Sequence, residues 1–369
     1  MTAKVLEETG IADEPSWTIV LVTEPRSGRL AGIEGSPLAG VQGLRRVDWH
    51  DDMDEAERAA LLDAALPEAD ALVVAPWTYR TIPRFTPERW ALAPRLKVIA
   101  GTFDNRFGNW LDVADANGRG VTVVDTSRSM TPTVAEFALA MTLSAIRDIP
   151  AAVQLVREGG WQTAHWDQPG FVSGDLSGRR VGLAGFGVIN RRYAELIAPF
   201  HCDVMTYDPF VDEAEMARVG VRPVASLPEL AAQSEVFIVG IPPTPATQQI
   251  ISREVIDALP QGAIVVIVTR MAVIEQEALW RRAEAGEIRA AVDVFEPEPP
   301  PADASFRRSP YVLPTPHIAG NTWVCHRRCF TTACDDALAV LAGREPIYRV
   351  SVRDELLYRG ETGRALAAR

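Results

Sequence analysis

Three polar residues in the second half of the chain stand at or just beyond the ends of strand-like segments. Arg270 ends the apolar run 263–269, Glu298 lies beyond the run 289–294, and His317 follows later. A guanidinium can hold a carboxylate, an imidazole can exchange a proton near neutral pH, and a carboxylate beside an imidazole raises its pKa and orients its ring. Reduction of a 2-oxo acid needs these groups and a cofactor that supplies the hydride. Each residue alone is typical of a surface side chain or a turn, so the hypothesis requires that all three meet.

A strand, turn, helix and second strand precede these residues and could bind the cofactor. The apolar run 181–184 predicts a buried strand, and Gly185-Phe186-Gly187 predicts a tight turn before a helix. The second strand ends at Asp208, 23 residues after Gly185. In dinucleotide-binding units the glycines let the pyrophosphate approach the helix N-terminus, and the acid accepts hydrogen bonds from the ribose. A carboxylate there repels a 2′-phosphate, so we predict NAD rather than NADP.

The elements that would position these residues alternate between strands and helices along the chain. Strand-like runs occupy 17–23, 69–75, 96–100, 121–124, 203–207, 236–241, 263–269 and 289–294, and helical patterns occupy 55–65, 131–149, 252–259 and 275–286. Such alternation is typical of parallel sheets covered by helices on both faces. The largely apolar helix 131–149 must be buried on most sides, so we expect it to bridge two domains or to line a subunit interface. A length of 369 residues allows about two domains.

Two loops in the first half are candidates for substrate contact, because ligands of parallel sheets bind beyond the carboxyl ends of the strands. One loop contains Trp77 and Thr78, and the other begins with Gly101 and Thr102. The same side chains could instead pack beneath their loops, and the sequence favours neither interpretation.

The composition argues against several classes of function. A net charge of −12 is unfavourable for binding nucleic acid or anionic membranes. The sequence contains no run of about 18 apolar residues, and the acidic segment 1–16 lacks the apolar centre of a signal peptide, so we expect a cytoplasmic protein. The spacing of Cys202, Cys325, Cys329 and Cys334 fits no common zinc site, so we expect reduced, buried thiols and no metal.

Several motifs follow one another in a characteristic order. They are Gly185-Phe-Gly-Val-Ile189, Tyr207-Asp208-Pro209, Thr269-Arg270, Asp293-Val-Phe-Glu-Pro-Glu298 and Pro314-Thr-Pro-His317-Ile-Ala-Gly320. In this respect the sequence resembles the D-isomer-specific 2-hydroxyacid dehydrogenase family, which includes phosphoglycerate, glyoxylate/hydroxypyruvate and D-lactate dehydrogenases. The resemblance extends from about residue 96 to residue 322 and is strongest over 176–322.

The resemblance implies an NAD-dependent oxidoreductase that transfers a hydride between nicotinamide and a 2-oxo or D-2-hydroxy acid. It assigns the substrate carboxylate to Arg270 and the acid/base pair to His317 with Glu298, and not Glu296. We expect the cofactor to contact Gly185, Phe186, Gly187, Val188, Ile189, Asp208, Pro242, Thr269, Asp293 and Thr133. We expect the substrate to contact Trp77, Thr78, Gly101, Thr102 and Arg270.

The resemblance also implies the fold, which is α/β with two Rossmann-like, doubly wound parallel-sheet domains and an interdomain cleft. We expect tails at 1–16 and 351–369, a discontinuous substrate-binding domain at 17–128 and 323–350, and an NAD-binding domain at 129–322. Members of the family are usually dimers through the nucleotide-binding domain, so we expect a homodimer.

Three departures from the family pattern leave the substrate open. Met271-Ala272 replaces the two glycines that usually follow the arginine, Asn190 replaces the third glycine of the turn, and the loop 101–110 is longer than usual. The same site could instead oxidise a phosphorus oxyanion such as phosphite or a phosphonate, because a guanidinium binds those anions as well. A non-catalytic, NAD(H)-sensing protein of the corepressor type is a further alternative. Glu298, where a formate dehydrogenase would have glutamine, argues against that activity.

Overall fold

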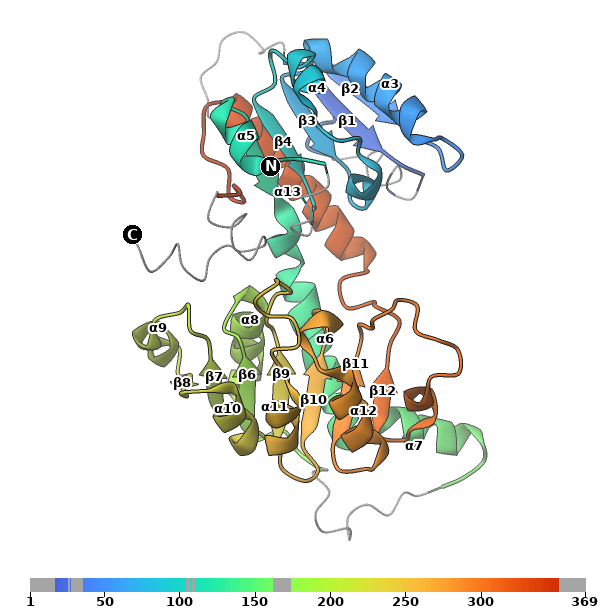
Figure 1. The fold of residues 1–369 in the computed structure, drawn as a ribbon, viewed down its shortest axis with the longest axis vertical. Helices are drawn as coiled ribbons and strands as arrows, with labels where there is room; N and C mark the ends of the chain where they lie inside the picture. The colour runs from blue at the N-terminus through green and yellow to red at the C-terminus, as the bar shows by residue number, and fades with distance from the viewer. Residues whose placement is uncertain are drawn as a thin grey trace. The chain divides into compact units, whose positions relative to one another are not determined.

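The computed structural model describes residues 17–25, 27, 36–103, 107, 110–161 and 174–351. The chain forms two compact units, which we call unit 1 (residues 1–130 and 323–369) and unit 2 (residues 131–322). Each unit is built on a parallel β-sheet (Figure 1). The predicted α/β class with two Rossmann-like parallel sheets is confirmed. The assignment of substrate binding to unit 1 stays a prediction.

Unit 1 contains a five-stranded sheet with the strand order β2-β1-β3-β4-β5. The strands are β1 (Ile19–Thr23), β2 (Leu44–Asp48), β3 (Ala71–Val74), β4 (Val98–Gly101) and β5 (Thr122–Asp125). The helices are α3 (Glu55–Ala65), α4 (Pro87–Ala91), α5 (Val113–Gly118) and α13 (Trp323–Leu341), with the 3-10 helices η1 (Leu66–Glu68), η2 (Thr78–Thr81) and η3 (Thr126–Met130).

Side chains on both faces of the central strands of unit 1 are apolar, because helices cover both faces. Val20 and Leu72 pack on the side of α3, α4 and α5, whereas Leu21 and Val73 pack on the side of α13. The edge strand β2 was not predicted. It reads Leu-Arg-Arg-Val-Asp and buries only Val47 among its five residues, so it has no apolar run that would indicate a strand.

Unit 2 contains a seven-stranded sheet with the strand order β12-β11-β10-β9-β6-β7-β8. Its strands are β6 (Arg180–Ala184), β7 (Asp203–Tyr207), β8 (Arg222–Pro223), β9 (Val236–Val239), β10 (Ile264–Ile267), β11 (Arg289–Val292) and β12 (Val312–Pro314). Its helices are α6 (Thr131–Arg147), α7 (Ile149–Arg157), α8 (Val188–Ile197), α9 (Glu213–Arg218), α10 (Leu227–Gln233), α11 (Arg253–Ala258) and α12 (Gln276–Glu284), with the 3-10 helices η4 (Ala198–Phe200), η5 (Met271–Val273) and η6 (Ser305–Arg308).

The strand order of unit 2 reverses at β6, which pairs with β7 on one side and with β9 on the other. In open parallel sheets, ligands bind at the carboxyl end of such a reversal. Helices α10, α11 and α12 pack on one face of the sheet through a continuous apolar core. Helix α6 packs against β10, β11 and α8. The buried hydroxyls of Thr142 on α6 and Tyr193 on α8 are joined by a 2.9 Å hydrogen bond.

The predicted helix 131–149 corresponds to α6, and the helix α7 that follows it was not predicted. Helix α6 ends at Arg147, and Asp148 adopts a left-handed backbone conformation with φ of 52°. Proline in the first turn of α7 explains the break, because a proline starts a helix more readily than it continues one. No single helix in the described ranges is long and apolar enough to span a membrane; the segments Thr126–Arg147 and Ile149–Arg157 reach that length and composition only together, across a bend of 61°.

Candidate active site

The predicted glycine turn joins β6 to α8 at the strand reversal of unit 2. Gly185 has a φ of 82°, a conformation that favours glycine, and Gly187 is the N-cap of α8. A Cβ atom at Gly187 would meet no described atom within 4 Å, so the protein's own packing does not require a glycine there. No side chain among the described residues caps α8. The open space at an uncapped helix N-terminus fits the pyrophosphate of a dinucleotide.

Asp208, which follows β7, is bonded to the glycine turn. Its Oδ2 accepts a 2.8 Å hydrogen bond from the backbone N–H of Phe186, and its Oδ1 accepts one of 2.9 Å from Phe210. Each carboxylate oxygen can accept a second hydrogen bond, as the hydroxyls of a ribose would require. The residues at this strand reversal therefore fit NAD.

Asn190 occupies the third-glycine position without displacing the helix, which begins at Val188. Its side chain is buried, and its Nδ2 donates hydrogen bonds to the carbonyl oxygens of Ala184 and Gly185 at 3.2 and 2.7 Å. The amide of Asn190 therefore fills the space beside the turn.

His317 and Glu298 form a hydrogen-bonded pair. The imidazole Nδ1 lies 2.8 Å from Glu298 Oε2, and both side chains are partly open to solvent, with 39% and 36% of their area exposed. The other carboxylate oxygen, Oε1, accepts a 2.8 Å hydrogen bond from the backbone N–H of Phe295. The Phe295 ring stacks on Phe306, with centroids 5.2 Å apart, and Phe306 stacks on Trp280. The aromatic stack thus supports the loop that carries Glu298.

The environment of Glu298 favours its ionised form. Burial, the largest single contribution, raises the pKa of Glu298, but hydrogen bonds from His317 and from the Phe295 N–H, with the charges of His317 and Arg270, together hold this pKa below its ordinary value. An ionised Glu298 accepts a hydrogen bond from Nδ1–H, which leaves Nε2 as the ring nitrogen that can exchange a proton with a substrate.

Asp293 holds the loop that carries His317. This carboxylate is fully buried and accepts hydrogen bonds from the Thr315 hydroxyl at 2.6 Å and from the backbone N–H groups of Ile318 and Ala319 at 3.0 and 2.8 Å. His317 lies between these donors with a φ of 54°, a conformation that most side chains disfavour. Asp293 therefore fixes the backbone on both sides of the imidazole; its expected contact with the nicotinamide stays a prediction.

Arg270 follows β10 on the same carboxyl edge of the sheet. Its Nη1 donates a 2.7 Å hydrogen bond to the carbonyl of Thr269, and its charge contributes to the lowered pKa of Glu298. The Thr269 hydroxyl is bonded to the carbonyl of Val239. Met271, which replaces a family glycine, points into the apolar core of unit 2 and not into solvent.

The other predicted cofactor residues lie around the glycine turn and on helix α6. Val188 and Ile189 form the first turn of α8, and Phe186 is buried beneath the guanidinium of Arg191. Pro242 follows β9, and its carbonyl accepts a 2.6 Å hydrogen bond from Thr247. Thr133 lies in the first turn of α6. Contacts of these residues with a cofactor remain predictions.

The four predicted substrate residues of unit 1 lie at the carboxyl ends of β3 and β4. Thr78 and Thr102 are buried, and their hydroxyls are bonded to Ser27 and Thr126 at 3.1 and 3.0 Å. Gly101 ends β4, where a Cβ atom would clash with the Phe103 ring. Part of the longer loop at 101–110 lies outside the described residues.

Trp77 has a partner that was not predicted. Its indole Nε1 donates a 3.4 Å hydrogen bond to Nε2 of His326 on α13, and the Arg80 guanidinium lies over its ring at 4.8 Å. Burial lowers the pKa of His326, which suits the acceptor role of its ring. The two partners are 249 residues apart, so no local pattern could have indicated the pair.

The four cysteines carry free thiols; Cys325, Cys329 and Cys334 are buried, and Cys202 is partly buried. Within the described ranges, no three His, Cys, Asp or Glu side chains are grouped as a metal ion would require.

Comparisons with known proteins identify relatives of this chain. Residues 139–319 match the family described as D-isomer specific 2-hydroxyacid dehydrogenase, NAD binding domain. The D-3-phosphoglycerate dehydrogenase of Mycobacterium tuberculosis is 35% identical over 312 residues, which is 84% of this chain and 55% of that protein. The hydroxypyruvate reductase of Thermotoga maritima is 32% identical over 271 residues, which is 71% of this chain and 82% of that protein.

Solved structures show the same fold. The TT0316 protein from Thermus thermophilus is 28% identical with a TM-score of 0.69, over 90% of this chain and 100% of that one. A phosphoglycerate oxidoreductase from Rhizobium etli, 23% identical, has a TM-score of 0.76 over 91% of this chain and 98% of that one. The chain spans about half the length of the phosphoglycerate dehydrogenases that it matches. It covers most of the hydroxypyruvate reductase, however, and its second unit matches the NAD-binding domain. The chain therefore belongs to the D-isomer-specific 2-hydroxyacid dehydrogenase family.

Proposed function

We propose that the protein is an NAD-dependent oxidoreductase that interconverts a 2-oxo acid and the corresponding D-2-hydroxy acid. The observation that carries this proposal is the 2.8 Å contact between His317 Nδ1 and Glu298 Oε2, with the charge of Arg270 acting on the same carboxylate. A nucleotide sensor needs no such acid/base pair, so the contact favours catalysis over the corepressor-like alternative.

Each group has a distinct part in the proposed reduction. NAD, when bound in its reduced form, supplies the hydride that reaches C2 of the substrate. The Arg270 guanidinium binds the substrate carboxylate and draws electron density from the neighbouring carbonyl. His317 gives the proton on Nε2 to the oxygen that becomes the hydroxyl, and in the oxidation it takes this proton back. Glu298 keeps Nδ1 protonated and stabilises the imidazolium.

The loop contacts of this site serve the same chemistry. Proton transfer requires the imidazole nitrogen within hydrogen-bond reach of the reacting oxygen, so a small displacement is costly. Asp293 holds the backbone beside His317, and Glu298 holds the imidazole ring itself. We infer that this constraint lets a partly exposed side chain act as the acid.

Replacement of His317 by asparagine tests the proposal. Asparagine tolerates the positive φ of His317 but has no titrating group, so kcat should fall about 10³-fold while the Kd for NADH stays within about threefold. His201→Asn is a matched control, because His201 is exposed and has a similar φ of 52°. Turnover is followed by NADH absorbance on a panel of 2-oxo acids. Near-normal turnover by His317→Asn would contradict the proposed role of the imidazole.

The same panel separates the alternatives. Turnover of phosphite or a phosphonate with none of the 2-oxo acids would assign the site to phosphorus oxyanions. Tight binding of NADH without turnover of either class would assign the protein to nucleotide sensing.

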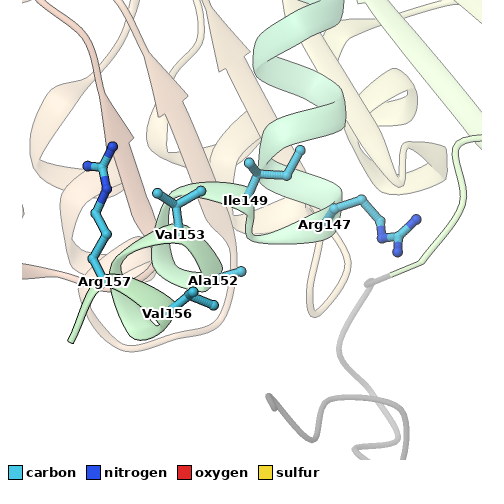
Figure 2. Close-up of a pocket in the computed structure, with 6 residues that line it drawn as sticks. All are labelled: Arg147, Ile149, Ala152, Val153, Val156 and Arg157. Atoms are coloured by element: carbon cyan, nitrogen blue, oxygen red, sulfur yellow. The ribbon is translucent and has the colours of Figure 1, made fainter. Parts of the chain in front are cut away.

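We also propose that the protein is a homodimer through unit 2. Helix α7 buries none of its side chains fully, and Ile149, Val153 and Val156 on it are 45%, 42% and 55% exposed. Together with Ala152 and flanked by Arg147 and Arg157, they line a shallow apolar surface (Figure 2). An apolar helix face of this kind is stabilised when a second copy covers it.

Light scattering coupled to size exclusion tests the dimer. Val153→Glu should convert a dimer to a monomer, because it introduces a charge into the covered face. Val219→Glu is the control, since Val219 is also exposed but lies at the end of α9. A monomeric wild-type protein would contradict the proposal.

A further inference from the structure

We propose that Asn190 positions the cofactor by holding one peptide plane of the glycine turn, the one between Gly185 and Phe186. The inference rests on the proposed cofactor site at this turn. Asn190 stands where the three-glycine pattern has its third glycine, so the amide would give this departure from the pattern a role in cofactor binding.

The peptide that links Gly185 to Phe186 is held at both of its polar atoms. Asn190 Nδ2 donates a 2.7 Å hydrogen bond to its carbonyl oxygen, and Asp208 Oδ2 accepts a 2.8 Å hydrogen bond from its N–H. The first residue of this peptide is a glycine with a φ of 82°, so sterics alone restrain the plane weakly. A flip of the plane would break both bonds and reverse its dipole beside the uncapped N-terminus of α8, where an anion must bind.

A second bond of Asn190 ties this turn to the neighbouring strands. Nδ2 also lies 3.2 Å from the carbonyl oxygen of Ala184, which accepts a 2.9 Å hydrogen bond from the N–H of Gly240. The ends of β6 and β9 and the first turn of α8 therefore meet at one carbonyl group. Movement of the Asn190 amide would disturb all three elements.

Gly240 provides the space that Asn190 occupies. A Cβ atom on Gly240 would lie 2.4 Å from Nδ2, 2.5 Å from Cγ and 2.7 Å from Oδ1 of Asn190. No real Cβ atom approaches a neighbour so closely, so any larger residue at 240 must displace the amide. The two positions are thus sterically coupled, because an asparagine at 190 requires a glycine at 240.

Packing alone does not account for an asparagine here. The side chain is 1% exposed, and its Oδ1 has no hydrogen-bond partner among the described residues. An unsatisfied buried oxygen is unfavourable, so an apolar residue of similar size would suit a purely structural position better. Compared with an apolar side chain, the amide adds two hydrogen bonds, from Nδ2 to the carbonyl oxygens of Ala184 and Gly185.

Four variants test this proposal: Asn190→Asp, Asn190→Gly, Gly240→Ala and the double variant Asn190→Gly/Gly240→Ala. Asn190→Asp keeps the shape but loses the donors, and we expect the Kd for NADH to rise about tenfold or more. Gly240→Ala should raise this Kd comparably, because the new methyl group displaces the amide. Asn190→Gly removes the amide and should raise the Kd by a similar factor, and the added methyl group of the double variant then has no amide to displace, so the double variant should bind NADH about as well as Asn190→Gly alone. Gln261→Glu, on the exposed surface of unit 2, is the control for the added charge.

The kinetic readout separates positioning from loss of structure. A positioning role predicts a raised KM for NADH with kcat at saturating NADH within about threefold of wild type, and thermal unfolding shows which variants are folded. The proposal is overturned if Asn190→Asp and Asn190→Gly both bind NADH within twofold of wild type. It is also overturned if the effects of Asn190→Gly and Gly240→Ala on the Kd multiply in the double variant, because Gly240→Ala would then act independently of the amide. NADH binding is measured without a 2-oxo acid, so wild-type binding without turnover would contradict only the proposed reaction, whereas no wild-type binding would overturn both.

Discussion

The carboxyl edges of the two sheets use their polar side chains in different ways. In unit 2, Asp293 and Glu298 receive hydrogen bonds that fix the loops around His317 and leave its Nε2 available. In unit 1, the hydroxyls of Thr78 and Thr102 are bonded to other hydroxyls of the same unit. The hydrogen bonds of the first edge hold the proposed catalytic pair in place, whereas those of the second join threonines to neighbouring hydroxyls of unit 1. From this difference we expect substitutions at the edge of unit 2 to impair chemistry and those at the edge of unit 1 to affect mainly stability.

Replacement of Asp293 should have the largest effect. Asp293→Ala leaves the buried N–H groups of Ile318 and Ala319 without their acceptor, which should cost about 3 kcal/mol of unfolding free energy and more than 100-fold in kcat. Urea unfolding and NADH-coupled turnover measure the two effects. Asp293→Asn, which keeps one oxygen acceptor, should lose less unfolding free energy and less kcat than Asp293→Ala. The comparison of the two edges would fail if Asp293→Ala lost stability but kept its turnover.

Glu298→Gln should lower kcat for reduction about 30-fold and change its pH dependence. The neutral amide no longer stabilises the imidazolium, so the pH above which reduction slows should move downward. Because its pKa is lowered from the ordinary value of 4.5, Glu298 is ionised at every pH above that value. The pH–rate profiles of the wild type and of Glu298→Gln should therefore differ throughout the neutral range. Glu296→Gln is the matched control, and an unchanged profile in Glu298→Gln would argue against the pair.

Asp208→Asn should have a smaller, cofactor-specific effect. The remaining carbonyl oxygen can still accept from Phe186, but the charge that disfavours a 2′-phosphate is lost. We expect kcat/KM for NADH to fall about tenfold and the ratio of NADPH to NADH activity to rise by a similar factor. An unaltered cofactor ratio would show that the charge of Asp208 does not set the preference.

Thr78→Val should have the smallest kinetic effect. The substitution keeps the shape and removes the hydroxyl that is bonded to Ser27, so we expect a loss of about 1 kcal/mol in stability and less than a twofold change in kcat/KM. A large increase in the substrate KM would support the predicted contact of Thr78 with the substrate, and the contrast between the two edges would then be wrong.

The sequence predicted the central strands and the motifs of unit 2, but not the edge strands β8 and β12, because apolar runs and motifs are local patterns. Buried strands such as β10 appear as apolar runs, and the carboxyl ends of parallel strands converge, which brings His317 and Glu298 into hydrogen-bonding distance. The predicted helix 131–149 extends two residues past the end of α6, because Ile149 continues the apolar pattern beyond Asp148.

Other features depend on partners far apart in the sequence. The stack of Phe295 on Phe306 and the pairing of Trp77 with His326 have no local signature. The bonds of Asn190 were also beyond prediction, because they require the positions of both a turn and a neighbouring strand. Motif spacing therefore predicted that His317 and Glu298 pair, but not the contacts that hold the two residues in place.

The charged edge strand β2 has a consequence for solubility. Among the described strands it pairs with β1 alone, and an outer strand with open hydrogen-bonding groups is a template on which foreign strands can assemble into aggregates. Arg45 and Arg46 are both exposed on this strand, where they form ion pairs with Glu68 and Asp48. A strand arriving at this border would have to desolvate those charges. The same composition that makes β2 inconspicuous in the sequence therefore shields the protein against fibril-like association.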